Sequence, residues 1–252
     1  MKLEDFVNVM EGIAPRSLAL DFDNPGLIVG TERQDIRRVL VALDCTCAAV
    51  DEAVRRNCDL VLTHHPLLFR AVKQILPDSP RTAPVYRLIR NGIGMFAAHT
   101  NLDSAEGGVN TVLCRLLGIV NEVAVPPENI CRLGELEREM SFSDFARIAE
   151  RVLDTKLRAA GHERMVKRVM VCGGSGGSEY PLAAEYGADV LVTGECKHSE
   201  ALEAVQAGVN LLVCGHYETE NAVLKPLMER LEELTQDVEY ILFEEGTPLR
   251  PL

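Results

Sequence analysis

Apolar runs of strand length alternate with amphipathic segments in the first half of the chain. The runs at 38–44, 58–66 and 93–100 are mainly apolar, and the segments between them, 48–57 and 83–92, carry apolar residues at helical spacing. Alternating strand and helix patterns are typical of a parallel or mostly parallel sheet covered by helices. The pattern therefore predicts an α/β fold.

The second half repeats this order of elements. Strand patterns open the segments 168–174, 189–196 and 210–220, and helical patterns separate them at 181–188 and 199–208. A second α/β series follows from the same periodicity argument.

A common offset relates the two series. Arg38 aligns with Arg168 and Asp59 aligns with Asp189, each pair being 130 positions apart. The third strand of each series also ends in a histidine that is followed four positions later by a carboxylate. Shared offsets of this kind indicate an internal duplication.

A polar segment at 121–140 and an amphipathic helix at 141–153 lie between the two series. We interpret the polar segment as a short link. The prediction is two related, closely packed α/β lobes, residues 1–125 and 126–252, whose sheets are covered by helices. They form one integrated unit with the functional site between the lobes.

Four of the six histidines stand where a predicted strand ends. His64 and His65 close one strand, His99 closes the next, and His216 closes the last strand of the second series. In open parallel sheets, ligand sites form beyond the carboxyl ends of the strands. A single histidine in such a place is more often a hydrogen-bonded structural residue, so it is the joint pattern that indicates a site.

Two of these histidines are accompanied by carboxylates. Asp103 follows His99, and Glu220 follows His216, at the spacing that places two side chains on one face of a helix. Neutral imidazoles and carboxylates bind divalent transition metals, and one carboxylate can bridge two ions about 3.5 to 4 Å apart. We therefore favour two metal ions in one pocket. A Ser/His/Asp triad is disfavoured because the strand ends carry more histidines than such a triad requires.

A glycine-rich segment, 173–178, follows one of the second-half strands. It lacks the P-loop ending and the GxGxxG spacing, so a flexible turn explains it as well as a phosphate-binding loop does. In the alignment of the two series, Gly194 and Glu195 replace His64 and His65, which makes the predicted site asymmetric. The candidates for polar groups at the wall of the pocket are Glu195, Lys197 and His198.

Charge and composition exclude some classes of protein. With 26 Lys and Arg against 38 Asp and Glu, the formal charge is -12, which disfavours binding to nucleic acid. No run reaches the ~18 apolar residues of a membrane span, and the acidic start does not resemble a signal peptide, so we expect a cytoplasmic protein. The eight cysteines lie mostly in apolar runs and fit buried thiols. The lone CxC of Cys45 and Cys47 lacks a second pair for zinc.

Three motifs together resemble a known family. The segments THHP (63–66), AAHTNLD (97–103) and GHYETE (215–220) are similar to those of the dinuclear-metal family called GTP cyclohydrolase 1 type 2, or Ngg1-interacting-factor-like. The motifs DNPGLIVG, VCGGSGG and TGECKH occur in the same order as in that family. The resemblance spans the whole chain and corresponds to the compact form without an inserted domain.

The resemblance implies a site, a reaction and an assembly. It implies two divalent ions per subunit, hydrolytic opening of the imidazole ring of GTP with release of formate, and a homohexamer. A set of histidine and carboxylate ligands suits iron, manganese, zinc, cobalt or nickel. His99 is then a further ligand or a proton-transfer group, and His198 is a second candidate for proton transfer. The metal ligands that it implies are His64, His65, Asp103, His216 and Glu220.

Two other functions compete with this hydrolase. A dinuclear phosphoesterase would use the same metals on phosphate oxygens. A ring-shaped, metal-binding scaffold or adaptor would have no catalytic activity. Product analysis separates the two enzymes, because one releases formate and the other releases inorganic phosphate.

Overall fold

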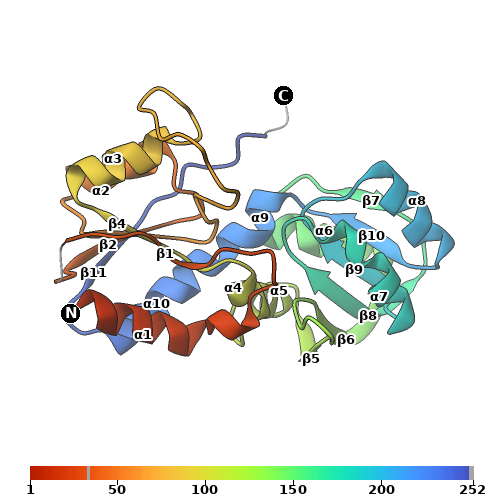
Figure 1. The fold of residues 1–252 in the computed structure, drawn as a ribbon. Coiled ribbons are helices and arrows are strands. Elements are labelled where there is room, and N and C mark those ends of the chain that lie inside the picture. Colours follow the sequence, from red (N-terminus) through yellow and green to blue (C-terminus); the bar gives the residue numbers. More distant parts are fainter. Residues whose placement is uncertain (33–34, 250–252) are drawn as a thin grey trace. The chain divides into compact units, whose positions relative to one another are not determined.

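A computed structural model describes residues 1–32 and 35–249. The chain is a mixed α/β protein with two sheets covered by helices, as the alternating pattern predicts (Figure 1). It divides into two compact units. Unit 1 comprises Met1–Ala105 and Leu224–Gly246, and unit 2 comprises Glu106–Val223 with the residues from Thr247 onward.

Unit 1 is built on a five-stranded sheet with the order β1-β4-β3-β2-β11. Four of its strands are parallel, and only β1, at one edge, runs antiparallel to its neighbour β4. All residues of the two central strands, β3 and β4, are buried, as expected for a sheet with helices on both faces. The strands are β1 (Gly26–Val29), β2 (Arg38–Ala42), β3 (Leu60–Thr63), β4 (Gly94–Ala97) and β11 (Glu239–Leu242).

Helices cover both faces of this sheet. Helices α2 and α3 lie on one face, and α1 and α10 lie on the other (Figure 1). Phe6 of α1 packs edge-on against Phe96 of β4, with ring centroids 6.1 Å apart. The hydroxyl of Thr46 accepts a hydrogen bond from the Ala49 amide and so caps the start of α2. The helices are α1 (Leu3–Ile13), α2 (Cys47–Arg55), α3 (Ala83–Asn91), α4 (Thr100–Ser104) and α10 (Leu224–Leu234), with a 3-10 turn η1 at Arg16–Leu18.

Unit 2 is built on a six-stranded sheet with the order β5-β6-β8-β9-β10-β7. Its three central strands, β8, β9 and β10, are parallel, and the flanking strands are antiparallel to their neighbours. The strands are β5 (Ile119–Ala124), β6 (Arg132–Ser141), β7 (Arg158–Ala160), β8 (Met165–Cys172), β9 (Val190–Thr193) and β10 (Asn210–Val213).

The helices of unit 2 cover its sheet. Ala183 of α7 and Ala204 of α8 are buried in one cluster with Met170 and Leu191 of the sheet, while α5 and α6 pack against β6 and β8. The hydroxyl of Ser141 accepts a hydrogen bond from the Asp144 amide, which confirms the predicted helix start there. The elements are α5 (Val109–Leu116), α6 (Phe142–Val152), α7 (Tyr180–Glu185), α8 (His198–Gln206) and α9 (His216–Glu220), with 3-10 turns η2 (Gly176–Glu179) and η3 (Asn221–Val223).

The strand register confirms the predicted duplication for the central strands. In unit 1, Val39 of β2 lies opposite Leu60 of β3. In unit 2, Val169 of β8 lies opposite Val190 of β9. Both residues of the second pair are 130 positions after those of the first, so the two strand pairs have the same register.

An aspartate repeats the same contact at the start of each strand pair. Asp59 Oδ2 accepts hydrogen bonds from the amides of Arg37 and Arg38, at 2.8 and 3.2 Å. In unit 2, Asp189 Oδ2 accepts from the two amides at the equivalent positions, both at 2.9 Å. The aligned aspartates are therefore structural residues that fix the loop entering the first strand of each pair.

Two features differ from the sequence-based prediction. The segment 121–140 is not a link, because most of it forms the hairpin of β5 and β6, which joins the sheet of unit 2. The units also do not follow the expected division at 125 and 126. The chain returns at Leu224–Gly246 to unit 1, where β11 pairs in parallel with β2.

Cysteine and membrane expectations can be checked against the same structure. None of the eight cysteines, all of which lie in the part of the chain that the structure describes, forms a disulfide, and six of them are buried, which confirms reduced core thiols. Burial raises the pKa of Cys45 to about 12, so this thiol stays protonated at neutral pH. None of the helices within residues 1–32 and 35–249 is long and apolar enough to cross a bilayer.

Candidate metal centre

Three histidines of unit 1 lie together at the carboxyl ends of two neighbouring strands. His64 and His65 follow β3, and His99 follows β4. The parallel pairing of these strands brings their ends side by side. The three rings have centroids 5.0 to 5.7 Å apart, and one ring nitrogen from each lies within 4.8 Å of the others. We call this group the histidine cluster.

Hydrogen bonds orient two of these rings in the same way. His64 Nδ1 lies 2.8 Å from the carbonyl oxygen of Ala98, and His65 Nδ1 lies 2.8 Å from Oδ1 of Asp44. A carbonyl or an ionised carboxylate can only accept, so each neutral ring carries its proton on Nδ1. The lone pair of each ring is then on Nε2, the nitrogen with which an imidazole held in this way binds a metal ion.

His99 is held by a buried carboxylate in the same manner. Its Nδ1 lies 2.7 Å from Asp23 Oδ1, and Asp23 Oδ2 accepts hydrogen bonds from the amide and the hydroxyl of Thr100, at 3.0 and 2.5 Å. Burial alone would raise the pKa of Asp23, but the hydrogen bonds from His99 and Thr100 outweigh it and lower this pKa to about 2. Asp23 therefore stays ionised and fixes both His99 and the start of α4.

Asp103 adds a carboxylate to the histidine cluster. It lies on the first turn of α4, where its amide donates to the carbonyl of His99. The sequence predicted its side chain beside His99, and the structure places Asp103 Oδ1 3.6 Å from Nε2 of His64. Nitrogen and carboxylate oxygen atoms thus face each other within unit 1, the donor types that divalent transition metals select.

A second pair of metal-binding side chains lies in unit 2. His216 begins α9 and Glu220 ends it, and His216 Nε2 is 3.0 Å from Glu220 Oε2. The predicted placement of these two side chains on one helix face is confirmed. Gly215, just before the helix, has a φ of 94°, which favours glycine at this sharp turn between β10 and α9. We call this group the His216–Glu220 pair.

Glu195 orients the imidazole of this pair. Its Oε1 lies 3.3 Å from His216 Nδ1, and its Oε2 accepts a hydrogen bond from the Ser175 hydroxyl at 2.7 Å. Glu195 occupies the position that aligns with His65 in the duplication. A candidate ligand position in unit 1 therefore corresponds to a carboxylate in unit 2 that lies beside Nδ1 of His216.

Packing explains why unit 2 has no histidine at the position that aligns with His64. A Cβ on Gly194, which aligns with His64, would lie 2.7 Å from the Gly174 carbonyl oxygen, 2.7 Å from Thr219 Oγ1 and 2.8 Å from the His216 Cα. These contacts are too close for any side chain. The asymmetry predicted from the alignment is thus a requirement of the way the loops around α9 pack.

The glycine-rich segment serves this packing. The amides of Gly173, Gly174 and Gly177 donate to Asn110 Oδ1, Thr219 Oγ1 and the Glu195 carbonyl, at 2.8, 3.1 and 3.1 Å. A Cβ on Gly174 would lie 2.0 Å from Glu220 Oε1. The structure therefore favours the interpretation of 173–178 as a tight turn, because three of its amides are engaged with the protein and the lack of a side chain at Gly174 leaves room for Glu220.

His198 stands apart from these groups. It is the first residue of α8 and is exposed. No metal-binding group found within residues 1–32 and 35–249 includes it. Its assignment as a proton-transfer residue stays a prediction.

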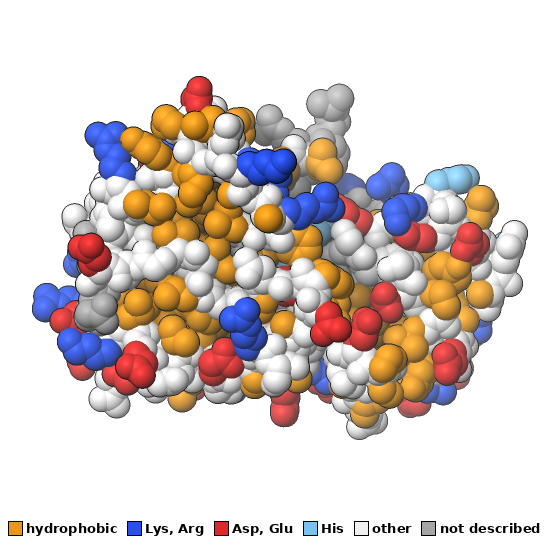
Figure 2. All heavy atoms as spheres, in the orientation of Figure 1, with side chains coloured by type: hydrophobic (Ala, Val, Ile, Leu, Met, Phe, Trp, Pro, Cys, Tyr) orange, Lys and Arg blue, Asp and Glu red, His pale blue; other side chains and the backbone are white. Residues whose placement is uncertain are grey.

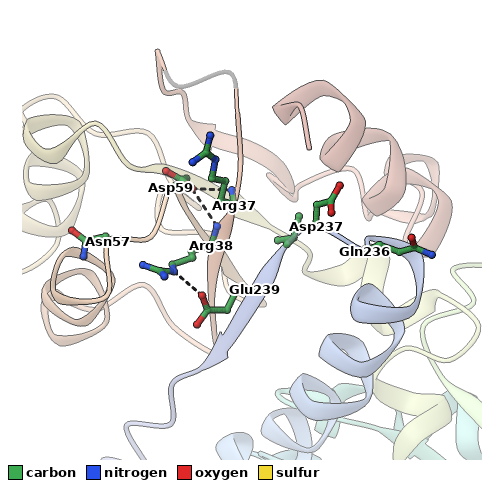
Figure 3. Close-up of a pocket in the computed structure, with 8 residues that line it drawn as sticks. Arg37, Arg38, Asn57, Asp59, Gln236, Asp237 and Glu239 are labelled. Atoms are coloured by element: carbon green, nitrogen blue, oxygen red, sulfur yellow. Dashed lines mark hydrogen bonds and ion pairs between the residues drawn. The ribbon is translucent and has the colours of Figure 1, made fainter.

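A surface pocket of unit 1 lies at the opposite ends of the strands (Figure 3). It is next to the amino ends of β2 and β11, where Arg38 pairs with Glu239 at 2.6 Å. Ligand sites of parallel sheets form at the carboxyl ends, so this pocket is not the candidate site. The residues that line it are Arg37, Arg38, Asn57, Asp59, Gln236, Asp237, Val238 and Glu239.

Sequence reasoning missed Asp23 and Asp44. Asp44 follows β2, so its strand-end position was a usable signal. Asp23 lies in the turn before β1, 76 positions from His99, and only the folded loops bring these two residues together. Both act by orienting an imidazole, a role that is common around metal ligands.

The donor chemistry fits a divalent metal ion. The imidazoles present Nε2 atoms, their Nδ1 atoms face carbonyl or carboxylate oxygens, and further carboxylates stand beside them. Fold and side chains together define an α/β protein with a candidate metal centre of His and acidic residues.

Comparisons with known proteins identify the family. The profile of the Duf34/NIF3 (NGG1p interacting factor 3) family matches residues 1–248. A Clostridium perfringens protein named GTP cyclohydrolase 1 type 2 homolog is 37% identical over 255 residues, covering 98% of this chain and 97% of the relative. NIF3-like protein 1 of Drosophila melanogaster is 29% identical, in an alignment that covers 88% of this chain and 79% of the Drosophila protein. The chain belongs to the Duf34/NIF3 family, as the motifs indicated.

Solved structures agree with this family assignment. The Staphylococcus aureus protein SA1388 superposes with a TM-score of 0.91 at 27% identity, covering 100% of this chain and 99% of its own. A Bacillus cereus protein related to NIF3 has the same fold, with a TM-score of 0.90 at 24% identity. The homohexamer implied by the family resemblance stays a prediction.

Replacing Glu195 tests its orienting role. We expect Glu195→Ala to weaken metal binding by about 10- to 100-fold, because His216 loses the carboxylate that holds Nδ1. Glu195→Gln keeps an acceptor oxygen, so its metal affinity should fall less than that of Glu195→Ala. Metal titration of the purified protein measures the affinity, and nitrogen NMR of the histidine rings reports which nitrogen of His216 carries the proton. Glu4→Ala, an exposed change on α1, is the control; equal affinities in all four proteins would contradict the role.

Proposed function

We propose that this chain is a cytoplasmic, divalent-metal-dependent hydrolase that opens the imidazole ring of GTP and releases formate. The observation that supports it most is the histidine cluster, in which all three Nδ1 atoms face acceptor oxygens and one ring nitrogen from each histidine lies within 4.8 Å of the others. The name of the relatives as GTP cyclohydrolase 1 type 2 homologs supports a nucleotide as the substrate.

The proposal assigns two divalent ions per subunit to the side chains of both donor groups. Iron, manganese, zinc, cobalt and nickel all suit imidazole and carboxylate ligands. When bound, the ions supply Lewis acidity, which lowers the pKa of water at the site and polarises the substrate. The proposed ligands are His64, His65, Asp103, His216 and Glu220.

His99 is the proposed proton-transfer residue. Asp23 holds its Nδ1, so a proton can be accepted or released only at Nε2. The ionised Asp23 stabilises the ring when it carries both protons. In the ring opening, one water adds at C8 of the guanine and one of the two bonds from C8 to a ring nitrogen breaks, which leaves a formamide on the other nitrogen. A second water then adds at the same carbon, the remaining bond from carbon to nitrogen breaks, and formate leaves. In both steps His99 moves a proton from the water to the departing nitrogen.

Product analysis tests this function. Purified protein is stripped of metal, reloaded in turn with iron, manganese or zinc, and incubated with GTP, and formate and inorganic phosphate are both measured. We expect formate from at least one metal-loaded form and none from the stripped protein. Phosphate without formate would replace the proposal by a phosphoesterase. Neither product from protein carrying two ions per chain would support a non-catalytic metal-binding scaffold.

A further inference from the structure

Two exposed phenylalanines of unit 1 face each other on neighbouring loops. Phe22 lies in the turn before β1 and is 65% exposed, and Phe69 lies after the histidines that follow β3 and is 40% exposed. Their rings meet edge to face, with centroids 6.1 Å apart and an angle of 80° between the ring planes. Exposing two neighbouring aromatic rings to water is unfavourable, and apolar surface of this kind often marks a binding site.

The pair is continuous with the histidine cluster. The rings of Phe69 and His99 have centroids 5.8 Å apart and lie at 84° to each other. Phe22 directly precedes Asp23, whose carboxylate holds His99. The two phenylalanines therefore lie directly beside the histidine cluster.

Hydrogen bonds hold the two loops in place. The side-chain amide of Asn24 donates to the Leu68 carbonyl at 2.9 Å, which links the turn of Phe22 to the loop of Phe69. The Leu20 amide donates to Thr100 Oγ1 at 3.0 Å, and this links the same turn to α4. The two rings thus sit on loops tied to each other and to α4, and a ligand could use them without first ordering a flexible segment.

Exposure alone does not single out this pair. Figure 2 shows hydrophobic side chains at several places on the surface of unit 1, and Ile89 of α3 is 58% exposed. Single apolar side chains at a surface are normal. What distinguishes Phe22 and Phe69 is that their rings contact each other and that Phe69 also contacts the imidazole of His99, a member of the histidine cluster.

We propose that Phe22 and Phe69 form a stacking surface for the planar heterocycle of the substrate. A flat ring on this surface would lie beside His99, so its reactive edge would face the candidate metal ligands. Three amides of the glycine-rich turn, those of Gly173, Gly174 and Gly177, already donate to groups of the protein. We therefore expect the base to contribute more to ligand binding than the phosphate chain does. The assignment of a purine base rests on the proposed function.

Ligand binding to the metal-free protein tests the surface independently of catalysis. Guanosine and inorganic triphosphate are used as separate probes, and their affinities are measured by NMR titration of the full chain. We expect Phe22→Ala to weaken guanosine binding about tenfold, as loss of one stacking ring does. Phe22→Tyr keeps the ring and should bind guanosine within about twofold of wild type. Ile89→Ala, which changes an equally exposed side chain on α3, should have no effect.

The outcomes separate this inference from the proposed reaction. Guanosine binding that depends on Phe22, in a protein that releases no formate, would retain the stacking surface and reject the cyclohydrolase. Formate release with unchanged guanosine affinity in Phe22→Ala would retain the reaction and reject the surface. The surface is also rejected if wild-type protein binds triphosphate but not guanosine, or if Phe22→Ala weakens both probes equally.

Discussion

His64→Ala should remove metal from the protein and abolish its metal-dependent activity. His64 is 1% exposed, its Nδ1 faces the Ala98 carbonyl, and its Nε2 lies 3.6 Å from Asp103. Loss of residues that only support a ligand costs 10- to 100-fold in metal affinity, so loss of this ligand should cost more than about 100-fold. Metal content per chain after dialysis, measured by mass spectrometry, is the direct test.

His64→Ala also affects stability, which must be separated from metal loss. The Ala98 carbonyl loses its hydrogen-bond donor, at a cost of roughly 1–3 kcal/mol. Urea unfolding of the metal-free proteins measures this part alone. His162→Ala, on an exposed loop of unit 2, is the matched histidine control and should keep wild-type metal content. Wild-type metal content in folded His64→Ala would show that the histidine cluster does not hold the ion.

Gly194→Ala should disturb the His216–Glu220 pair although it adds a single methyl group. The new Cβ would meet the Gly174 carbonyl and Thr219 Oγ1 at 2.7 Å and the His216 Cα at 2.8 Å. Two of these neighbours are backbone atoms, so the loop of Gly174 and the start of α9 must move apart. We expect a loss of about 1–3 kcal/mol in the free energy of unfolding, typical of overpacking, together with weaker metal binding.

Urea unfolding and metal titration of the same samples check the two parts of this prediction. Gly30→Ala is the matched control, because a Cβ there would meet no atom within 4 Å. It should leave metal affinity unchanged. If Gly194→Ala unfolds at the wild-type urea concentration and binds metal normally, the close packing between the glycine-rich turn and α9 is not what holds the pair.

The parts of the fold with strong periodicity could be predicted from the sequence. The central strands, the helices between them and the duplication follow from apolar patterns and a constant offset. The hairpin of β5 and β6 could not, because β6 carries the exposed, fully charged run 137–139. Strand β11 is four residues long and follows a charged helix, so its pairing with β2 leaves little trace in the sequence.

The candidate site was predictable to a similar degree. Strand ends identified His64, His65, His99 and His216, because parallel strands bring their carboxyl ends together. The carboxylates that orient the rings depend on loop contacts between distant positions, as with Asp23. Sequence patterns indicate where a group stands along an element, whereas contacts between loops follow from the packing of the whole unit.

The return of the chain to unit 1 sets an order for biosynthesis. The segment Glu106–Val223 supplies all helices and strands of unit 2 without interruption, so a nascent chain can complete these elements while residues 224–246 are still inside the ribosome. Until β11 emerges, β2 is an open edge whose backbone groups can pair with another chain. Unit 1, most of which is translated first, is therefore the last unit to finish folding. The edge of β2 stays exposed until Tyr240 and Ile241 pair with it.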